Sequence, residues 1–149
     1  QGPRRLITRL ELKRNVQYEI LEHTADTGIK AYGDGVNEIF ENAALGMFDL
    51  MTDLALVRPV GEARVEVEAH DLESLLVEWL NELLFLHEVD HAFFVEFVVS
   101  VKGLALQGMA RGEEVDPARH RLEQQVKAVT YHMLEVNPAE GYATVIFDV

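Results

Sequence analysis

Two segments of the sequence repeat their apolar residues at helical spacing, and this periodicity limits the possible folds more than any other feature. In residues 36 to about 51 the repeating residues are Ile39, Ala43, Ala44, Met47, Phe48 and Met51. The second segment follows Asp71, a residue suited to capping a helix, and its repeating residues are Leu72, Leu75, Leu76, Trp79, Leu80, Leu83 and Leu86. Side chains three and four residues apart share one face of a helix. We therefore predict two amphipathic helices.

The remaining apolar runs have a β character. RVEVEA alternates strictly after Gly61, YEIL and IKAYG flank a polar loop, and AFFVEFVVSV, LALQGMARG, VKAVTYHMLEV and YATVIFDV are separated by turn residues. We predict a single α+β domain in which two helices pack on a largely antiparallel or mixed β-sheet. This domain comprises residues 18–149, and residues 1–17 form a basic N-terminal extension.

Composition limits the classes of function. The 149 residues suit one domain, and no apolar run reaches the roughly 18 residues of a membrane span. The chain has no cysteine, which excludes disulfides and thiolate zinc sites. With no signal-peptide pattern either, we expect a cytoplasmic protein with no membrane partner.

The charge is strongly acidic and unevenly distributed. The formal net charge is −13, yet five basic residues lie within the first 14 residues: Arg4, Arg5, Arg9, Lys13 and Arg14. An acidic body repels phosphate backbones, so we expect no direct nucleic-acid binding and favour a cation or a basic protein as partner. On composition alone, the charge could equally serve only to keep the domain in solution.

The five residues HEVDH, His87 to His91, match the zinc-peptidase pattern H-E-x-x-H. In such enzymes two histidines one helical turn apart hold zinc, within a long helix and with a third ligand downstream. Here the β-rich run AFFVEFVVSV starts directly after His91, and no H-x-x-G-x-x-H follows. We therefore interpret HEVDH as the C-terminal turn of the second helix, where histidine also suits the helix dipole.

Oxygen ligands offer a different metal site. The loop EHTADTG carries His23, Thr24 and Asp26 between two strands, and the last strand ends with Asp148 and the α-carboxylate of Val149. We expect Glu140, across the NPAEG turn, to lie near them. Crowded carboxylates require a compensating cation, and hard oxygen ligands favour Ca²⁺, Mg²⁺ or Mn²⁺. An ordinary Asx turn at the loop and a frayed chain end remain the alternatives.

The strand KAVTYH contains two further candidate residues, Lys127 and His132. Strand alternation places Lys127, Val129 and Tyr131 on one face and Ala128, Thr130 and His132 on the other. A half-exposed sheet edge would explain this pattern without any function. The sequence has no Gly-rich phosphate loop and no GxSxG elbow, so nucleotide-binding and nucleophilic chemistry are unsupported.

Taken together, EHTADTGI, DLESLLVEWLNELLFL, VKAVTYH and VIFDV, in this order and over residues 18–149, resemble the archease family. The resemblance implies an accessory protein and not an enzyme: an activator of an RtcB-type RNA ligase, which joins tRNA halves and repairs broken RNA. Archeases promote guanylylation of the ligase's active-site histidine and allow multiple turnover.

The resemblance also implies site residues. A divalent metal ion, Ca²⁺ first and Mg²⁺ or Mn²⁺ as alternatives, would be held by Asp26, Asp148 and Val149, with Lys127 also implicated in activity. His23 and His132 are further candidates. Two other classes stay open: a metal-dependent hydrolase using His87 and His91 or the acidic cluster, and a chaperone-like protein-binding module that needs no metal.

Overall fold

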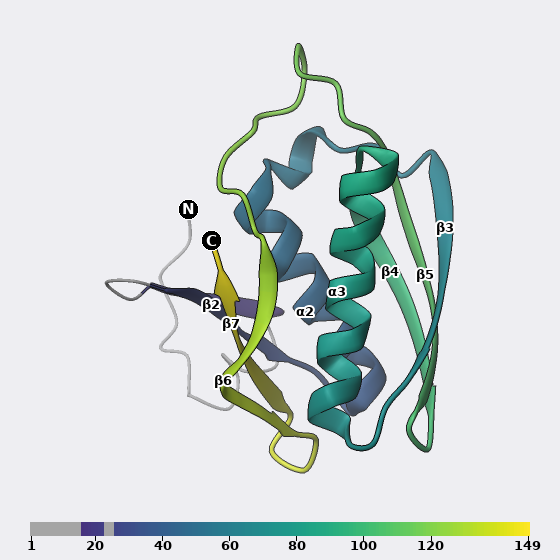
Figure 1. Ribbon diagram of the computed structural model, residues 1–149, viewed down its shortest axis with the longest axis vertical. Coiled ribbons are helices and arrows are strands. Elements are labelled where there is room, and N and C mark those ends of the chain that lie inside the picture. The colour runs from purple at the N-terminus through teal and green to yellow at the C-terminus, as the bar shows by residue number, and fades with distance from the viewer. Residues whose placement is uncertain (1–15, 23–25) are drawn as a thin grey trace, which may run out of the picture.

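The computed structural model describes residues 16–22 and 26–149 (Figure 1). Its helices are α2 (Val36–Met51), the short 3₁₀ helix η1 (Leu54–Leu56) and α3 (Leu72–Asp90). Its strands are β1 (Tyr18–Glu22), β2 (Thr27–Tyr32), β3 (Gly61–Glu68), β4 (Ala92–Lys102), β5 (Ala105–Glu114), β6 (Ala128–Asn137) and β7 (Tyr142–Asp148). The two predicted helices are confirmed, as is the antiparallel pairing of the strands.

The strands form two sheets rather than the one sheet that we expected. One sheet has the order β1-β2-β7-β6 and the other the order β3-β5-β4. The helices lie between the sheets: α2 contacts β2 and β4, and α3 contacts β6 and β3 (Figure 1). Alternation is a local property of each strand, so it cannot tell which distant strand becomes its partner.

The core fills the space between these layers. Its largest fully buried side chains include Trp79, Phe40, Phe48, Phe93 and Phe147. The indole Nε1–H of Trp79 donates to the carbonyl oxygen of Phe40 at 3.0 Å, so the polar atom of this buried ring is satisfied and α3 is tied to α2. At the start of α3, an oxygen of Asp71 accepts the Ser74 N–H at 2.7 Å, which confirms the predicted cap.

Helix side chains bond to one edge strand of each sheet. At the β4 edge, the N–H groups of Val99 and Val101 donate to Glu41 and Asn37 of α2, each at 2.8 Å. At the β6 edge, the Val129 N–H donates to Asn81 of α3 at 3.1 Å. These bonds satisfy strand groups that would otherwise be free to pair with another chain. Within the described ranges, no helix is both long and apolar enough to cross a membrane.

Candidate functional site: the shared end of three strands

Strand pairing brings Asp26 and Asp148 to the same end of the four-stranded sheet. Thr27 of β2 pairs with Phe147 of β7 in antiparallel register. Asp26 directly precedes Thr27 and Asp148 directly follows Phe147, so continuing the register by one residue sets the two aspartates opposite each other. Directly opposed residues in a sheet share a face, which places both carboxylates on the same side.

The third strand brings Lys127 to this end. Ala128 of β6 pairs with Asp148, and the Lys127 N–H donates to the Asp148 carbonyl oxygen at 2.8 Å. By the same register, Lys127 lies opposite Val149. Lys127 therefore shares the face of Val149, on the other side of the sheet from the Asp148 side chain, and its own side chain is exposed.

The two faces of this strand end have different environments. Phe147 is fully buried, and Val149, on the same face, packs against the core, whereas Asp148 is exposed on the other face. Asp148 also belongs to β7 and pairs with β6. This pairing contradicts the frayed-end alternative for Asp148, because a paired residue with a packed neighbour is held in place.

The donor set is made of hard oxygen atoms. The carboxylates of Asp26 and Asp148, with the terminal carboxylate of Val149, would provide three anionic oxygen ligands, the type that Ca²⁺, Mg²⁺ and Mn²⁺ prefer. Over residues 16–22 and 26–149, no group of three His, Asp or Glu side chains could hold a metal ion. Among the described residues, the third oxygen ligand of a metal at this strand end would be the main-chain carboxylate.

One predicted neighbour, Glu140, does not join the strand-end cluster of Asp26, Lys127, Asp148 and Val149. Glu140 lies in the turn before β7, at the opposite end of that strand from Asp148, so its expected position near the cluster is wrong. The seven residues of β7 separate the two ends at roughly 3.3 Å per residue. His23 and Thr24 lie outside the described residues.

The predicted face of His132 is also affected by an irregularity. The β6–β7 register shifts between Thr130 and Glu135, and Met133 has a positive φ of 54°. The expected alternation therefore holds through Thr130 and fails beyond it, because the extra residues leave the regular ladder. His132 is exposed, and the register does not bring it to Asp148.

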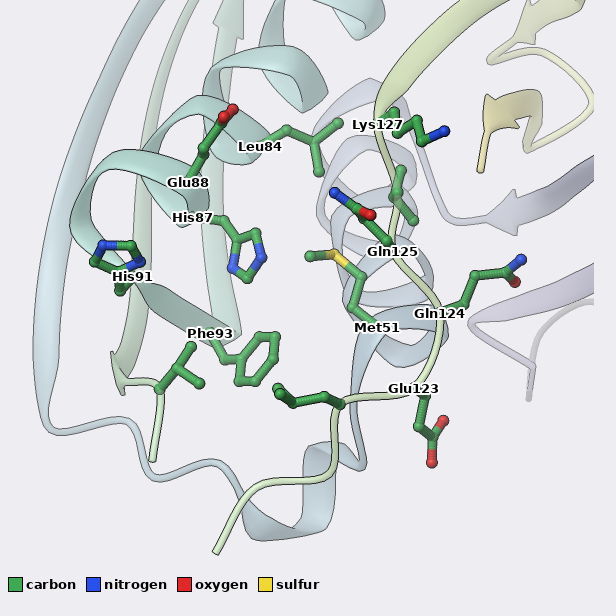
Figure 2. A pocket seen from close by; sticks show the side chains of 13 residues that line it. Met51, Leu84, His87, Glu88, His91, Phe93, Glu123, Gln124, Gln125 and Lys127 are labelled. Carbon is green, nitrogen blue, oxygen red and sulfur yellow. The ribbon is translucent and has the colours of Figure 1, made fainter. Parts of the chain in front are cut away.

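HEVDH is the end of α3, as predicted. The helix ends at Asp90, and His91 adopts the left-handed conformation with φ 51° and ψ 50°. The His87 ring stacks on Phe93 with ring centres 5.2 Å apart, whereas Glu88 and His91 point away from it (Figure 2). The two histidines do not converge on a common point, so they cannot form the paired zinc ligands of a peptidase.

Sequence reasoning missed a cavity beside His87. Its volume is about 520 Å³, and it lies between the last turns of α3, the start of β4 and residues 122–127, which we call the strap (Figure 2). Periodicity could not reveal it, because the strap has no regular structure. The only signal in the sequence was His87, which the zinc pattern had marked for a different reason.

A network around Glu113 holds the loop between β5 and the strap. Glu113 accepts hydrogen bonds from the Arg119 guanidinium and, at 2.7 Å, from the Arg58 N–H. The buried ring of His120 accepts the Asp116 N–H at Nδ1, so its Nε2–H donates to Glu113 at 3.0 Å. The Arg119 hydrogen bond is the main reason that the pKa of Glu113 falls to about 2.

Comparison with known proteins identifies relatives. The model of the Archease protein family (MTH1598/TM1083) matches residues 18–149. "Protein archease" of Methanothermobacter thermautotrophicus is 45% identical over 137 residues, covering 88% of this chain and 97% of its own length. "Protein archease" of Methanosarcina mazei is 44% identical over 140 residues, covering 89% of this chain and 96% of its own. The solution structure of Methanobacterium thermoautotrophicum protein 1598 superposes with a TM-score of 0.71 at 42% identity, covering 89% of this chain and 99% of that one.

Proposed function

Because the chain belongs to the archease family, we propose that it is an accessory activator of an RtcB-type RNA ligase that uses a divalent metal ion held by Asp26, Asp148 and Val149. In this role it would promote guanylylation of the ligase and multiple turnover in tRNA splicing and RNA repair. The family assignment agrees with the prediction that the chain is an accessory protein and not an enzyme.

One observation carries the proposal: three strands of one sheet bring the candidate residues to a common end. The pairing of Thr27 with Phe147 aligns Asp26 with Asp148, and the pairing of Ala128 with Asp148 aligns Lys127 with Val149. Residues far apart in the chain thus gather at one end of the sheet. The cluster is exposed at Asp148 and Lys127, which suits contact with another protein.

The charges indicate how the cluster would act. A bound divalent cation would supply positive charge to an anionic group, such as a nucleotide phosphate in the ligase. Asp26 and Asp148 would hold the cation, and Lys127, on the other face of the same strand end, would offer a second positive charge to the partner. The acidic body, with a net charge of −13, supports a basic protein surface as partner and not RNA itself.

The test is RNA ligation by a purified RtcB-type ligase, with and without this protein, under single-turnover and multiple-turnover conditions. We expect faster ligase guanylylation and multiple turnover with the wild-type protein. Asp148→Ala removes one metal ligand, and we expect it to reduce the stimulation about tenfold or more. No gain in either regime with the wild-type protein would reject the proposed function.

Glu140→Ala is the matched control, because it removes an exposed carboxylate at the other end of β7. We expect it to stimulate the ligase as well as the wild-type protein does. If Asp26→Ala combined with Asp148→Ala also left the stimulation intact, the chain would act as a protein-binding module that needs no metal.

A further inference from the structure

The cavity beside His87 has the character of a pocket for a side chain. Its volume of about 520 Å³ is within the range of ligand pockets, roughly 300–1,000 Å³. Much of its wall is apolar and comes from Met51, Leu84, Phe93, Leu122 and Val126. Leu122 is 65% exposed at this wall, whereas the other four residues are buried. An apolar wall with an exposed leucine at its rim favours an apolar occupant.

Two polar groups, His87 and Gln125, face this space. The Nδ1 of His87 lies 2.8 Å from the Ala92 carbonyl oxygen, and because a carbonyl only accepts, Nδ1 carries the hydrogen. In the neutral ring, Nε2 is then left as an acceptor. Figure 2 shows Phe93 and Met51 next to the His87 ring and the Gln125 side chain directed toward it from the strap. An occupant with one N–H or O–H group can therefore be hydrogen bonded here.

The charges around the pocket select the partner. Two of its lining residues, Glu88 and Glu123, are exposed acids, and Lys127 is the one lining residue with a Lys or Arg side chain. The chain as a whole has a formal net charge of −13. This field repels phosphate groups and attracts basic ones. A nucleotide would therefore bind less well here than a positively charged peptide segment.

The pocket is held in place and is connected to the strand-end cluster. The N–H groups of Glu123 and Gln124 donate to the carbonyl oxygens of Met51 and Leu50 at 3.0 and 3.2 Å. At the other end of the strap, the Lys127 N–H donates to Asp148. A wall fixed at both ends needs little ordering on binding. One partner surface could thus contact the pocket and the cluster together.

We propose that this cavity, the strap pocket, receives a tryptophan or tyrosine side chain from a basic segment of the partner protein. The aromatic ring would pack on the His87–Phe93 pair, its N–H or O–H would donate to His87 Nε2, and the flanking basic residues would face Glu88 and Glu123. The identity of the partner rests on the proposed function, whereas the chemistry of the pocket does not.

The first test is an NMR titration of the protein with the capped peptide Lys-Trp-Lys. We expect saturable shifts at His87 and Gln125, and binding about tenfold weaker for Lys-Ala-Lys and for Glu-Trp-Glu. Absence of shifts at the pocket with Lys-Trp-Lys would overturn the proposal. Tighter binding of GTP at the same residues would also overturn it, because the pocket would then be a nucleotide site.

Two neighbouring glutamines give a matched pair of variants. Gln125 is exposed on the strap and its side chain is directed toward His87, so Gln125→Trp should fill the pocket (Figure 2). The Gln124 side chain points away from His87, so Gln124→Trp adds the same ring outside the pocket. We expect Gln125→Trp to abolish the Lys-Trp-Lys shifts and to weaken binding to an RtcB-type ligase about tenfold, and Gln124→Trp to leave both unchanged. Equal effects of the two variants would contradict the proposal.

The two proposals fail in different ways. If the wild-type protein neither binds nor stimulates the ligase, the proposed function is wrong, and the peptide titration still decides whether the pocket takes a basic aromatic segment. If the ligase is stimulated but Gln125→Trp binds it normally, the docking proposal alone is wrong. The circular dichroism spectra and melting temperatures of both variants check that they fold.

Discussion

Glu113 is the residue whose ionisation most directly links structure to pH. Its carboxylate accepts hydrogen bonds from Arg119, the Arg58 N–H and His120, and its pKa is lowered to about 2. The unfolded-state pKa of glutamate is about 4.3. A lowered pKa stabilises the fold above the unfolded-state value, so this contribution is complete above about pH 5 and is lost as the pH falls toward 2.

We therefore predict that Glu113→Gln lowers the free energy of unfolding by about 1.5 kcal/mol or more at pH 7, since it removes hydrogen bonds to a charged group. The difference from the wild type should shrink at pH 3, where the native carboxylate contributes less. Urea denaturation at both pH values measures this. Glu114→Gln is the control. It changes the next residue in the chain, whose carboxylate is exposed, and it should change stability little. An equal loss from both variants would contradict the network.

At the scale of elements, the contact between α3 and β5 requires a glycine at position 108. A Cβ at Gly108 would lie 2.4 Å from the Trp79 ring, which is fully buried. We expect Gly108→Ala to force this ring to shift and to destabilise the fold by about 1–3 kcal/mol. Gly61→Ala is the control, since its nearest atom would be 3.6 Å away. Thermal denaturation compares the two, and a fully stable Gly108→Ala would show that the helix can move away from the sheet.

Elements were predictable from the sequence where their signals are local. The apolar spacing of residues 72–86 and the Asp71 cap predict α3, and the alternation of RVEVEA predicts β3. Which strands pair is a non-local property, so the division into two sheets and the register shift after Thr130 could not be predicted. Glu140 was misplaced for a different reason: the predicted strand YATVIFDV lies between it and the chain end, and the length of an extended strand separates it from Asp148.

The candidate site was predictable only in its chemistry. Carboxylates at Asp26, Asp148 and Val149 could be recognised as hard ligands, and their meeting depends on the β2–β7 register, which no local pattern encodes. The strap pocket could not be predicted as a cavity, although the zinc pattern had marked His87, because its walls come from α2, α3, β4 and an irregular segment. Sites built from distant segments become visible only when the fold is known.

At the scale of the whole molecule, charge should govern association. The net charge of −13 and the exposed acids near the strap pocket favour a basic partner surface. We predict that raising the salt concentration from about 0.05 M to about 0.5 M weakens binding to an RtcB-type ligase, mainly through a slower association rate. Surface plasmon resonance measures this rate. An association rate that does not depend on salt would indicate that the interface is mainly apolar.

Metal binding should also be visible in the stability of the whole fold, because β7 lies between β2 and β6 and ends at the cluster. A ligand that binds only the folded chain stabilises it by about 2.7 kcal/mol at 100 times its dissociation constant. For a chain of this size, this corresponds to a rise of about 5–10 °C in the melting temperature. We expect Ca²⁺ to produce this rise, EDTA to reverse it, and Asp26→Asn to abolish it. Glu140→Gln should retain it, because its carboxylate lies at the far end of β7. An unchanged melting temperature across Ca²⁺, Mg²⁺ and Mn²⁺ at millimolar concentration would show that the three carboxylates do not hold a divalent ion in the isolated protein.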